Sequence, residues 1–113
     1  MNKTPCIPMT KHHQELILDG RKTTTLRAKL FEAGVYRMFS RGAGSLGYLR
    51  VTKINDEQVI PGQMDAAKLR ALAWAEGYEY GPELLACMRQ LRLNPDKPYW
   101  LHTIEPCGAP ADN

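Results

Sequence analysis

The sequence predicts an α+β fold: a small curved sheet or barrel of about five to six mostly antiparallel strands with about three helices packed around it. Three observations support this. Short segments with strand-like alternation fill the first half of the chain, separated by hairpin-type loops. Two segments with apolar residues at helical spacing follow, and an apolar segment closes the chain. Strands followed by helices, rather than alternating with them, are typical of α+β domains.

Several segments of the first half have the marks of regular structure. Residues 5–9 lie between prolines and suit an edge strand, where a missing backbone N–H is harmless. A short helix is predicted next, because Thr10 can cap its start and Gly20 can end it. The predicted helix covers residues 11–19, and further strands are predicted at residues 23–28, 35–40 and 46–54, the last two joined by a loop at 41–45.

The second half is expected to hold two helices and a final strand. Residues 65–76 are rich in Ala and Leu and predict one helix, which Gly77 ends. Pro82 suits the first turn of another helix, which the turn residues 94–96 end. Residues 98–104 are apolar enough to form a central strand of the sheet.

Length and composition indicate one domain spanning residues 1–113, with a core over about 5–104 and a frayed tail at 105–113. No apolar run approaches the ~20 residues that a membrane span requires. The first residues lack the apolar segment of a secretory signal. We therefore expect a cytoplasmic protein with no membrane partner, and the sequence leaves its oligomeric state open.

The cysteines and histidines predict no metal site. Cys6, Cys87 and Cys107 are widely spaced and form no Cys-x-x-Cys pair, whereas a zinc site needs clustered ligands. His12 and His13 are adjacent rather than ligand-spaced, and each is expected to be a surface or half-buried residue. We expect reduced thiols, no bound metal and no cofactor.

Residues 20–27, Gly-Arg-Lys-Thr-Thr-Thr-Leu-Arg, form the most distinctive stretch of the chain. They are expected to run from a helix end through a tight turn into a strand. If the chain still turns at Lys22, its ammonium and the Thr25 hydroxyl can converge, with Arg21 and Arg27 on either side. Such a spot suits a phosphate, a carboxylate or a polarised carbonyl. The alternative is a solvated strand edge, where lysine discourages edge-to-edge pairing.

Two blocks of the sequence resemble the ASCH domain family, which belongs to the PUA-like barrels. The first is Gly-Arg-Lys-Thr-x-Thr-x-Arg at residues 20–27, which follows a short helix. The second is Ala-Glu-Gly-Tyr at residues 75–78, which ends a helix and precedes an aromatic closing strand. With these blocks in this order, the resemblance covers roughly residues 5–104 and implies a small PUA-like β-barrel.

The resemblance also implies an activity. One small bacterial branch of ASCH proteins is a metal-independent amidohydrolase, which removes the acetyl group from N4-acetylcytidine and related N4-acylated cytosine compounds. Its catalytic residues, placed on this chain by motif, fall on Lys22, Thr25 and Glu76. The polar residues then expected to bind the substrate, a small modified nucleoside, are Arg21, Arg27 and Tyr78.

The residue types suit amide hydrolysis independently of the resemblance. The reaction needs a nucleophile, a group that accepts its proton and a donor for the leaving amine. Thr25 offers the hydroxyl, and Lys22 can accept its proton if burial and positive neighbours favour the neutral amine. Glu76 can donate or relay a proton, or orient Lys22. The sequence leaves the roles of base and acid open between these two residues.

Two other functions stay open at this point. Residues 1–53 hold ten Lys and Arg against three Asp and Glu, whereas residues 54–113 hold five against nine. This basic excess suits a non-catalytic RNA-binding module, in which cations contact phosphates and Tyr36 or Tyr48 stacks on bases. A ribonuclease that uses the same cationic site is the third alternative. The cations available for RNA are Arg21, Lys22, Arg27, Arg37, Arg41 and Arg50.

Overall fold

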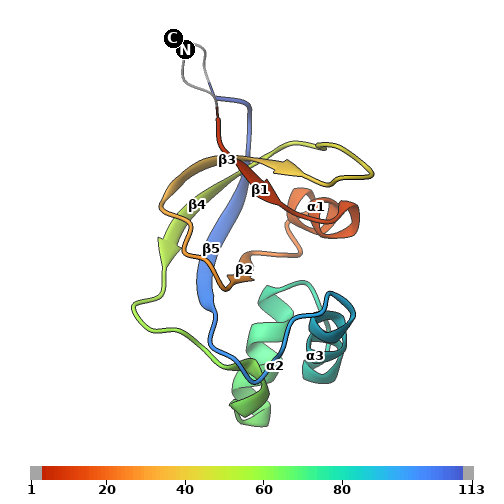
Figure 1. Ribbon diagram of the computed structural model, residues 1–113, viewed down its shortest axis with the longest axis vertical. Coiled ribbons are helices and arrows are strands. Elements are labelled where there is room, and N and C mark those ends of the chain that lie inside the picture. The colour runs from red at the N-terminus through yellow and green to blue at the C-terminus, as the bar shows by residue number, and fades with distance from the viewer. Residues whose placement is uncertain (1–3, 111–113) are drawn as a thin grey trace.

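The computed structural model describes residues 4–110 as one α+β unit, in which a five-stranded curled sheet forms half of a barrel and three α-helices pack around it (Figure 1). The predicted fold class is therefore confirmed. The elements are β1 (Cys6–Pro8), α1 (Lys11–Leu18), β2 (Thr24–Arg27), β3 (Gly34–Phe39), β4 (Tyr48–Ile54), a short 3₁₀ turn (Pro61–Gln63), α2 (Ala66–Ala75), α3 (Gly81–Gln90) and β5 (Trp100–Cys107).

The sheet has the strand order β1-β3-β4-β5-β2. Its pairs are antiparallel except for β1 with β3, which is parallel. The segment predicted at residues 5–9 is an edge strand, as expected, and β5 lies between β4 and β2, as predicted for a central strand. The two edges of the sheet are therefore β1 and β2, and both contribute residues to the cavity described below.

The helices form two groups (Figure 1). The helix α1 lies beside β1 at one end of the sheet, and its Ile17 joins a core cluster that includes Met38, Leu49 and Val51 from the inner face. The helices α2 and α3 lie together at the other end, below β2 in the view. Their buried residues form a second cluster with β2, β5 and the segment before β5: Leu26, Leu72, Ala73, Leu84, Met88 and Tyr99.

The last strand is longer than the sequence predicts. It continues to Cys107 because the whole of β4 pairs with it, from Ile54↔His102 to Tyr48↔Cys107. The predicted tail at 105–113 is therefore wrong for residues 105–107, and residues 111–113 of it lie outside the described residues. Within residues 4–110, no helix combines the length and the apolar character that crossing a membrane requires.

Candidate active site

The two blocks singled out in the sequence each begin at a helix end of the same type. At the end of α1, Gly20 adopts φ 76°, and the N–H groups of Gly20 and Arg21 donate to the carbonyls of Ile17 and Leu16. This pattern is a Schellman cap, in which glycine supplies the left-handed turn. It reverses the chain so that Lys22 points back into the protein, where its exposed fraction is 4%.

At the end of α2, Glu76 is the C-cap residue and Gly77 follows with φ 96°. The N–H of Tyr78 donates to the carbonyl of Ala73 at 2.8 Å, which completes a second Schellman cap. A Cβ atom at Gly77 would also lie 2.9 Å from Cδ1 of Leu16. Glycine is therefore required here twice, by its backbone angle and by the close approach of α1.

Lys22 and Glu76 meet in a buried ion pair. Nζ of Lys22 donates to Oε1 of Glu76 at 3.0 Å, and each side chain is about 95% buried. The hydroxyl of Thr24 donates to the other carboxylate oxygen, Oε2. The carboxylate is therefore fixed by two donors from the first block, although 52 residues separate Thr24 from Glu76.

The position of Glu76 works against local stability. It caps the C-terminal end of α2, where the helix dipole disfavours negative charge by roughly 0.3–1 kcal/mol. It is also buried, which disfavours any charge that lacks a partner. Lys22 compensates both effects. A buried carboxylate in so unfavourable a place is typical of a functional site.

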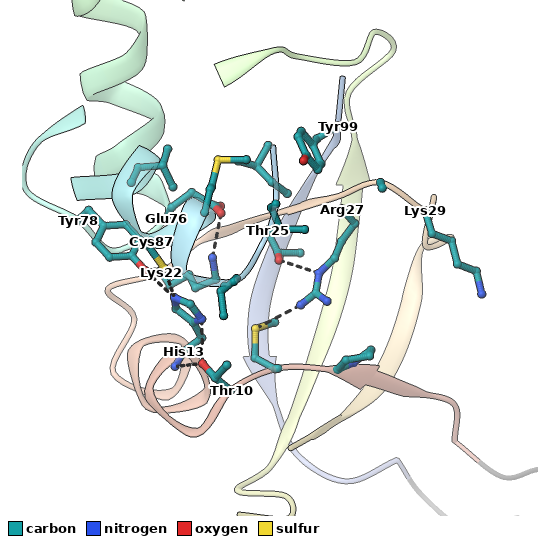
Figure 2. Close-up of a pocket in the computed structure, with 18 of the residues that line it drawn as sticks. Thr10, His13, Lys22, Thr25, Arg27, Lys29, Glu76, Tyr78, Cys87 and Tyr99 are labelled. Carbon is teal, nitrogen blue, oxygen red and sulfur yellow. Dashed lines mark hydrogen bonds and ion pairs between the residues drawn. The ribbon is translucent and has the colours of Figure 1, made fainter. Parts of the chain in front are cut away.

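This ion pair borders a cavity of about 510 Å³. The walls come from both edge strands, from α1 and α3, and from the segments before and after them. Figure 2 shows Lys22 and Glu76 pointing toward one another, with His13, Tyr78 and Cys87 on one side and Arg27 and Lys29 on the other. The lining is mainly apolar, from residues such as Met9, Leu26, Phe31, Leu84 and Met88, with a few polar groups among them. Such a composition and size are typical of small-molecule sites, which measure roughly 300–1,000 Å³.

Thr25 lines this cavity from β2, and its side chain is almost fully buried. Its Oγ1 accepts a hydrogen bond from Nε of Arg27 at 3.2 Å. Its carbonyl oxygen accepts one from Nδ1 of His102 at 3.3 Å. Because Nε2 of His102 accepts from the N–H of Phe31, the proton of this neutral imidazole is on Nδ1. Burial lowers the pKa of His102 and keeps it in that state.

A hydrogen-bonded chain of four side chains forms the opposite wall. Nδ1 of His13 lies 2.9 Å from Oγ1 of Thr10, and its Nε2 lies 2.6 Å from the hydroxyl of Tyr78. That hydroxyl donates to Sγ of Cys87 at 2.8 Å. Burial, with a smaller contribution from the charge of Lys22, lowers the pKa of His13 to about 4. His13 is therefore neutral at pH 7.

The structure brings five of the six residues predicted for the site to one cavity: Lys22, Thr25, Arg27, Glu76 and Tyr78. Arg21 does not line it. Its side chain is exposed and borders a separate hollow beside Trp74.

Sequence reasoning missed two residues of the site. Thr24, the neighbour of Thr25 on β2, donates to Glu76, and nothing in the sequence indicated this contact. His13 is 9% exposed and lines the cavity, whereas a surface or half-buried position was expected for it. The sequence feature that pointed to this position is the capping residue Thr10, three residues before His13. Its hydroxyl lies 2.9 Å from Nδ1 of His13 and fixes the ring.

The residues of the described chain offer no cluster of three or more His, Cys, Asp or Glu side chains that could hold a metal ion. What the arrangement supplies is a hydroxyl, an ammonium–carboxylate pair and a guanidinium around one small cavity.

Comparison with solved structures shows what this fold is. Protein EF3133 from Enterococcus faecalis V583, of family DUF984, matches with a TM-score of 0.65 and 20% identity, over 100% of this chain and 86% of that one. The ASCH domain from Lactobacillus crispatus JV V101 matches with a TM-score of 0.60 and 12% identity, over 84% of this chain and 70% of that one. The chain therefore has the fold of an ASCH domain, a small PUA-like barrel. No family model matches the sequence, and no curated protein matches it significantly.

Proposed function

We propose that this protein is an amidohydrolase that removes the acyl group from N4-acetylcytidine or a related N4-acylated cytosine nucleoside. One observation carries the proposal: Lys22, Thr25 and Glu76, from two distant stretches of the chain, line one cavity, with Lys22 and Glu76 joined in a buried ion pair. These are the groups that amide hydrolysis without a cofactor requires. The resemblance of the two sequence blocks to the acetylcytidine-hydrolysing ASCH proteins supplies the substrate class.

In the proposed mechanism, Oγ1 of Thr25 is the nucleophile. The Nε–H of Arg27 already donates to this oxygen, and such a bond stabilises the negative charge that develops as the hydroxyl loses its proton. The peptide at Thr25 is held by His102, so the hydroxyl is fixed before substrate arrives. A fixed nucleophile lowers the entropy cost of the attack.

The ion pair supplies the proton transfers. When the substrate displaces water from the cavity, one proton moves along the 3.0 Å bond from Lys22 to Glu76 and leaves a neutral amine and a carboxylic acid. The amine accepts the proton of Thr25, and the resulting ammonium stabilises the oxyanion. Glu76 then protonates the leaving N4 atom. Cytidine leaves as the acyl-threonine ester forms. Water then attacks the ester while Glu76 accepts its proton, Lys22 returns a proton to Oγ1 of Thr25, and the carboxylic acid is released. One proton moves from Glu76 back to Lys22 and restores the ion pair.

The shape of the site favours a small molecule over a polymer. The cavity of about 510 Å³ is of a size to hold a nucleoside. The six cations considered for RNA binding do not gather along one groove. Lys22 is paired inside the cavity, and Arg21 borders the second hollow. Arg37 and Arg50 are exposed on the outer face of β3 and β4, opposite the buried side chains of these strands.

The direct test is incubation with N4-acetylcytidine and measurement of cytidine release. The variants Lys22→Met and Glu76→Gln are expected to lower kcat by about 10²-fold or more, since general acid–base groups contribute on that scale. Thr25→Val removes the nucleophile and is expected to abolish turnover. Matched controls are Lys68→Met, Thr52→Val and Glu79→Gln, whose side chains are exposed and do not line the cavity. A wild-type protein that releases no more cytidine than buffer would refute the proposal, as would full turnover by Thr25→Val.

A further inference from the structure

The charged side chains that line the cavity do not balance. Lys22, Arg27 and Lys29 line it against a single carboxylate, Glu76, within the described part of the chain. His13 adds no charge near neutral pH, because burial and the charge of Lys22 lower its pKa to about 4. Lys22 and Glu76 neutralise each other in their ion pair. The excess positive charge therefore belongs to Arg27 and Lys29.

Arg27 has hydrogen-bond donors to spare. Of its five N–H groups, it uses Nε on Thr25 and Nη2 on the sulfur of Met9, 3.4 Å away and a weak acceptor. Among residues 4–110, no carboxylate oxygen lies within 4.0 Å of it. No buried side-chain nitrogen of this part of the chain lacks a partner. The third nitrogen, Nη1, has no hydrogen-bond partner among these residues and is therefore not completely buried.

The ring of Phe31 lies near both cations, and all three residues line the cavity, at a place we call the Phe31 rim. Cζ of Arg27 lies 5.9 Å and Nζ of Lys29 lies 5.6 Å from the centroid of its ring, a range in which the ring attracts a cation. Phe31 is itself fixed, because its N–H donates to Nε2 of the buried His102 at 2.9 Å. Figure 2 shows Arg27 and Lys29 on the side of the cavity opposite Tyr78.

We propose that the Phe31 rim binds a phosphate group of the substrate, so that the cavity binds a phosphorylated cytosine nucleotide more tightly than the corresponding neutral nucleoside. The identity of the base rests on the function proposed above. A guanidinium fork matches phosphate oxygens in geometry, and such charge-assisted bonds are about twice as strong as neutral ones. The Cα atoms of Arg27 and Thr25 lie one same-face step, ~7 Å, apart along β2, although Nε of Arg27 reaches Oγ1 of Thr25 at 3.2 Å. The phosphate therefore binds the end of the guanidinium that Thr25 does not use.

The test is calorimetric titration of the protein with cytidine, cytidine 5′-monophosphate, a cytidine tetranucleotide and inorganic phosphate. We expect the monophosphate to bind about tenfold more tightly than cytidine at low salt, the gain of one charge-assisted anion contact. High salt reduces the preference by screening. Lys29→Gln is expected to reduce it about threefold and Arg27→Gln to abolish it, whereas Lys68→Gln, an exposed lysine outside the cavity, leaves it unchanged.

The outcomes separate this inference from the proposed activity. Equal affinity for cytidine and the monophosphate overturns the inference and leaves the proposed activity standing. Equal binding of phosphate and the monophosphate without any binding of cytidine supports the anion site and argues against the cytosine substrate. If a cytidine tetranucleotide binds more tightly than the monophosphate, the ligand is a polymer, and the inference of a mononucleotide is overturned. If Arg27→Gln fails to fold, the exposed Lys29→Gln decides, and an unchanged preference there refutes the inference.

Discussion

The backbone N–H of Thr23 donates a 2.7 Å hydrogen bond to the carbonyl oxygen of Ala75. This bond joins the residue before β2 to the last turn of α2 and satisfies a carbonyl that the helix itself leaves free. It fixes the relative positions of the residues on either side, Lys22 and Glu76, whose side chains pair at 3.0 Å. The candidate site therefore depends on two helix ends held together by main-chain geometry.

The ion pair is expected to show strong coupling between its two members. Lys22→Met leaves a buried carboxylate without its cation, and Glu76→Leu leaves a buried ammonium without its anion. Each single change should lower the free energy of unfolding by about 3 kcal/mol. The double variant should recover most of that loss, because an apolar pair replaces the ion pair. Urea unfolding of the four proteins measures the coupling.

Activity distinguishes this coupling from mere stability. The double variant Lys22→Met/Glu76→Leu is expected to be stable and inactive, since both proton-transfer groups are gone. Losses that simply add in the double variant would show that the two side chains do not interact in solution.

The adjacent threonines of β2 are expected to affect turnover differently. Thr25→Val removes the proposed nucleophile and should abolish release of cytidine. Thr24→Val removes only a hydrogen bond to Glu76 and should lower kcat by about tenfold, while costing about 1–2 kcal/mol of stability. Steady-state kinetics with N4-acetylcytidine check this order. If Thr24→Val is less active than Thr25→Val, the nucleophile is Thr24 and not Thr25.

His13 is expected to make stability depend on pH between about 6.5 and 4. Its pKa is about 4 in the folded protein, against 6.5 in an unfolded chain, because burial disfavours the imidazolium. The unfolded state therefore binds more protons in this window. The contribution of neutral His13 to the free energy of unfolding is fully present above pH 6.5. It is lost as the pH falls toward 4, and amounts to about 3 kcal/mol.

Comparing variants separates the contribution of His13 to the pH dependence of stability from the contributions of other groups. Urea unfolding at several pH values should give a shallower decline for His13→Gln than for the wild type. His12→Gln, which changes the exposed neighbouring imidazole, should follow the wild type closely. Parallel curves for the wild type and His13→Gln would show that His13 is not buried as a neutral ring.

Gly77 is expected to tolerate no side chain. Gly77→Ala forces a left-handed φ of 96° on alanine and places Cβ 2.9 Å from Cδ1 of Leu16. We expect a loss of about 1–3 kcal/mol in unfolding free energy and a fall in turnover as Glu76 shifts. Gly42→Ala is the matched control, because no atom lies within 4 Å of its added methyl group. An equal effect of both changes would contradict the role of the cap.

The sequence predicted most of the architecture because its signals are local. Thr10 caps α1, Gly20 and Gly77 end their helices, and β5 is central, all as expected. The strand β5 was predicted too short, since residues 105–107 owe their strand structure to pairing with β4 and not to their own composition. A local sequence pattern cannot show where a strand ends when its last residues are held only by a neighbouring strand.

Within the site, the sequence by itself determined which chemical groups are present and that each block starts at a helix end. Only the tertiary structure decided which groups meet: Thr24 rather than Thr25 on Glu76, His13 in the wall, Arg21 outside it. Propensity and capping depend on neighbours within about four residues along the chain. Contacts across 50 or more residues depend instead on the curl of the sheet and on the direction in which each helix end turns the chain.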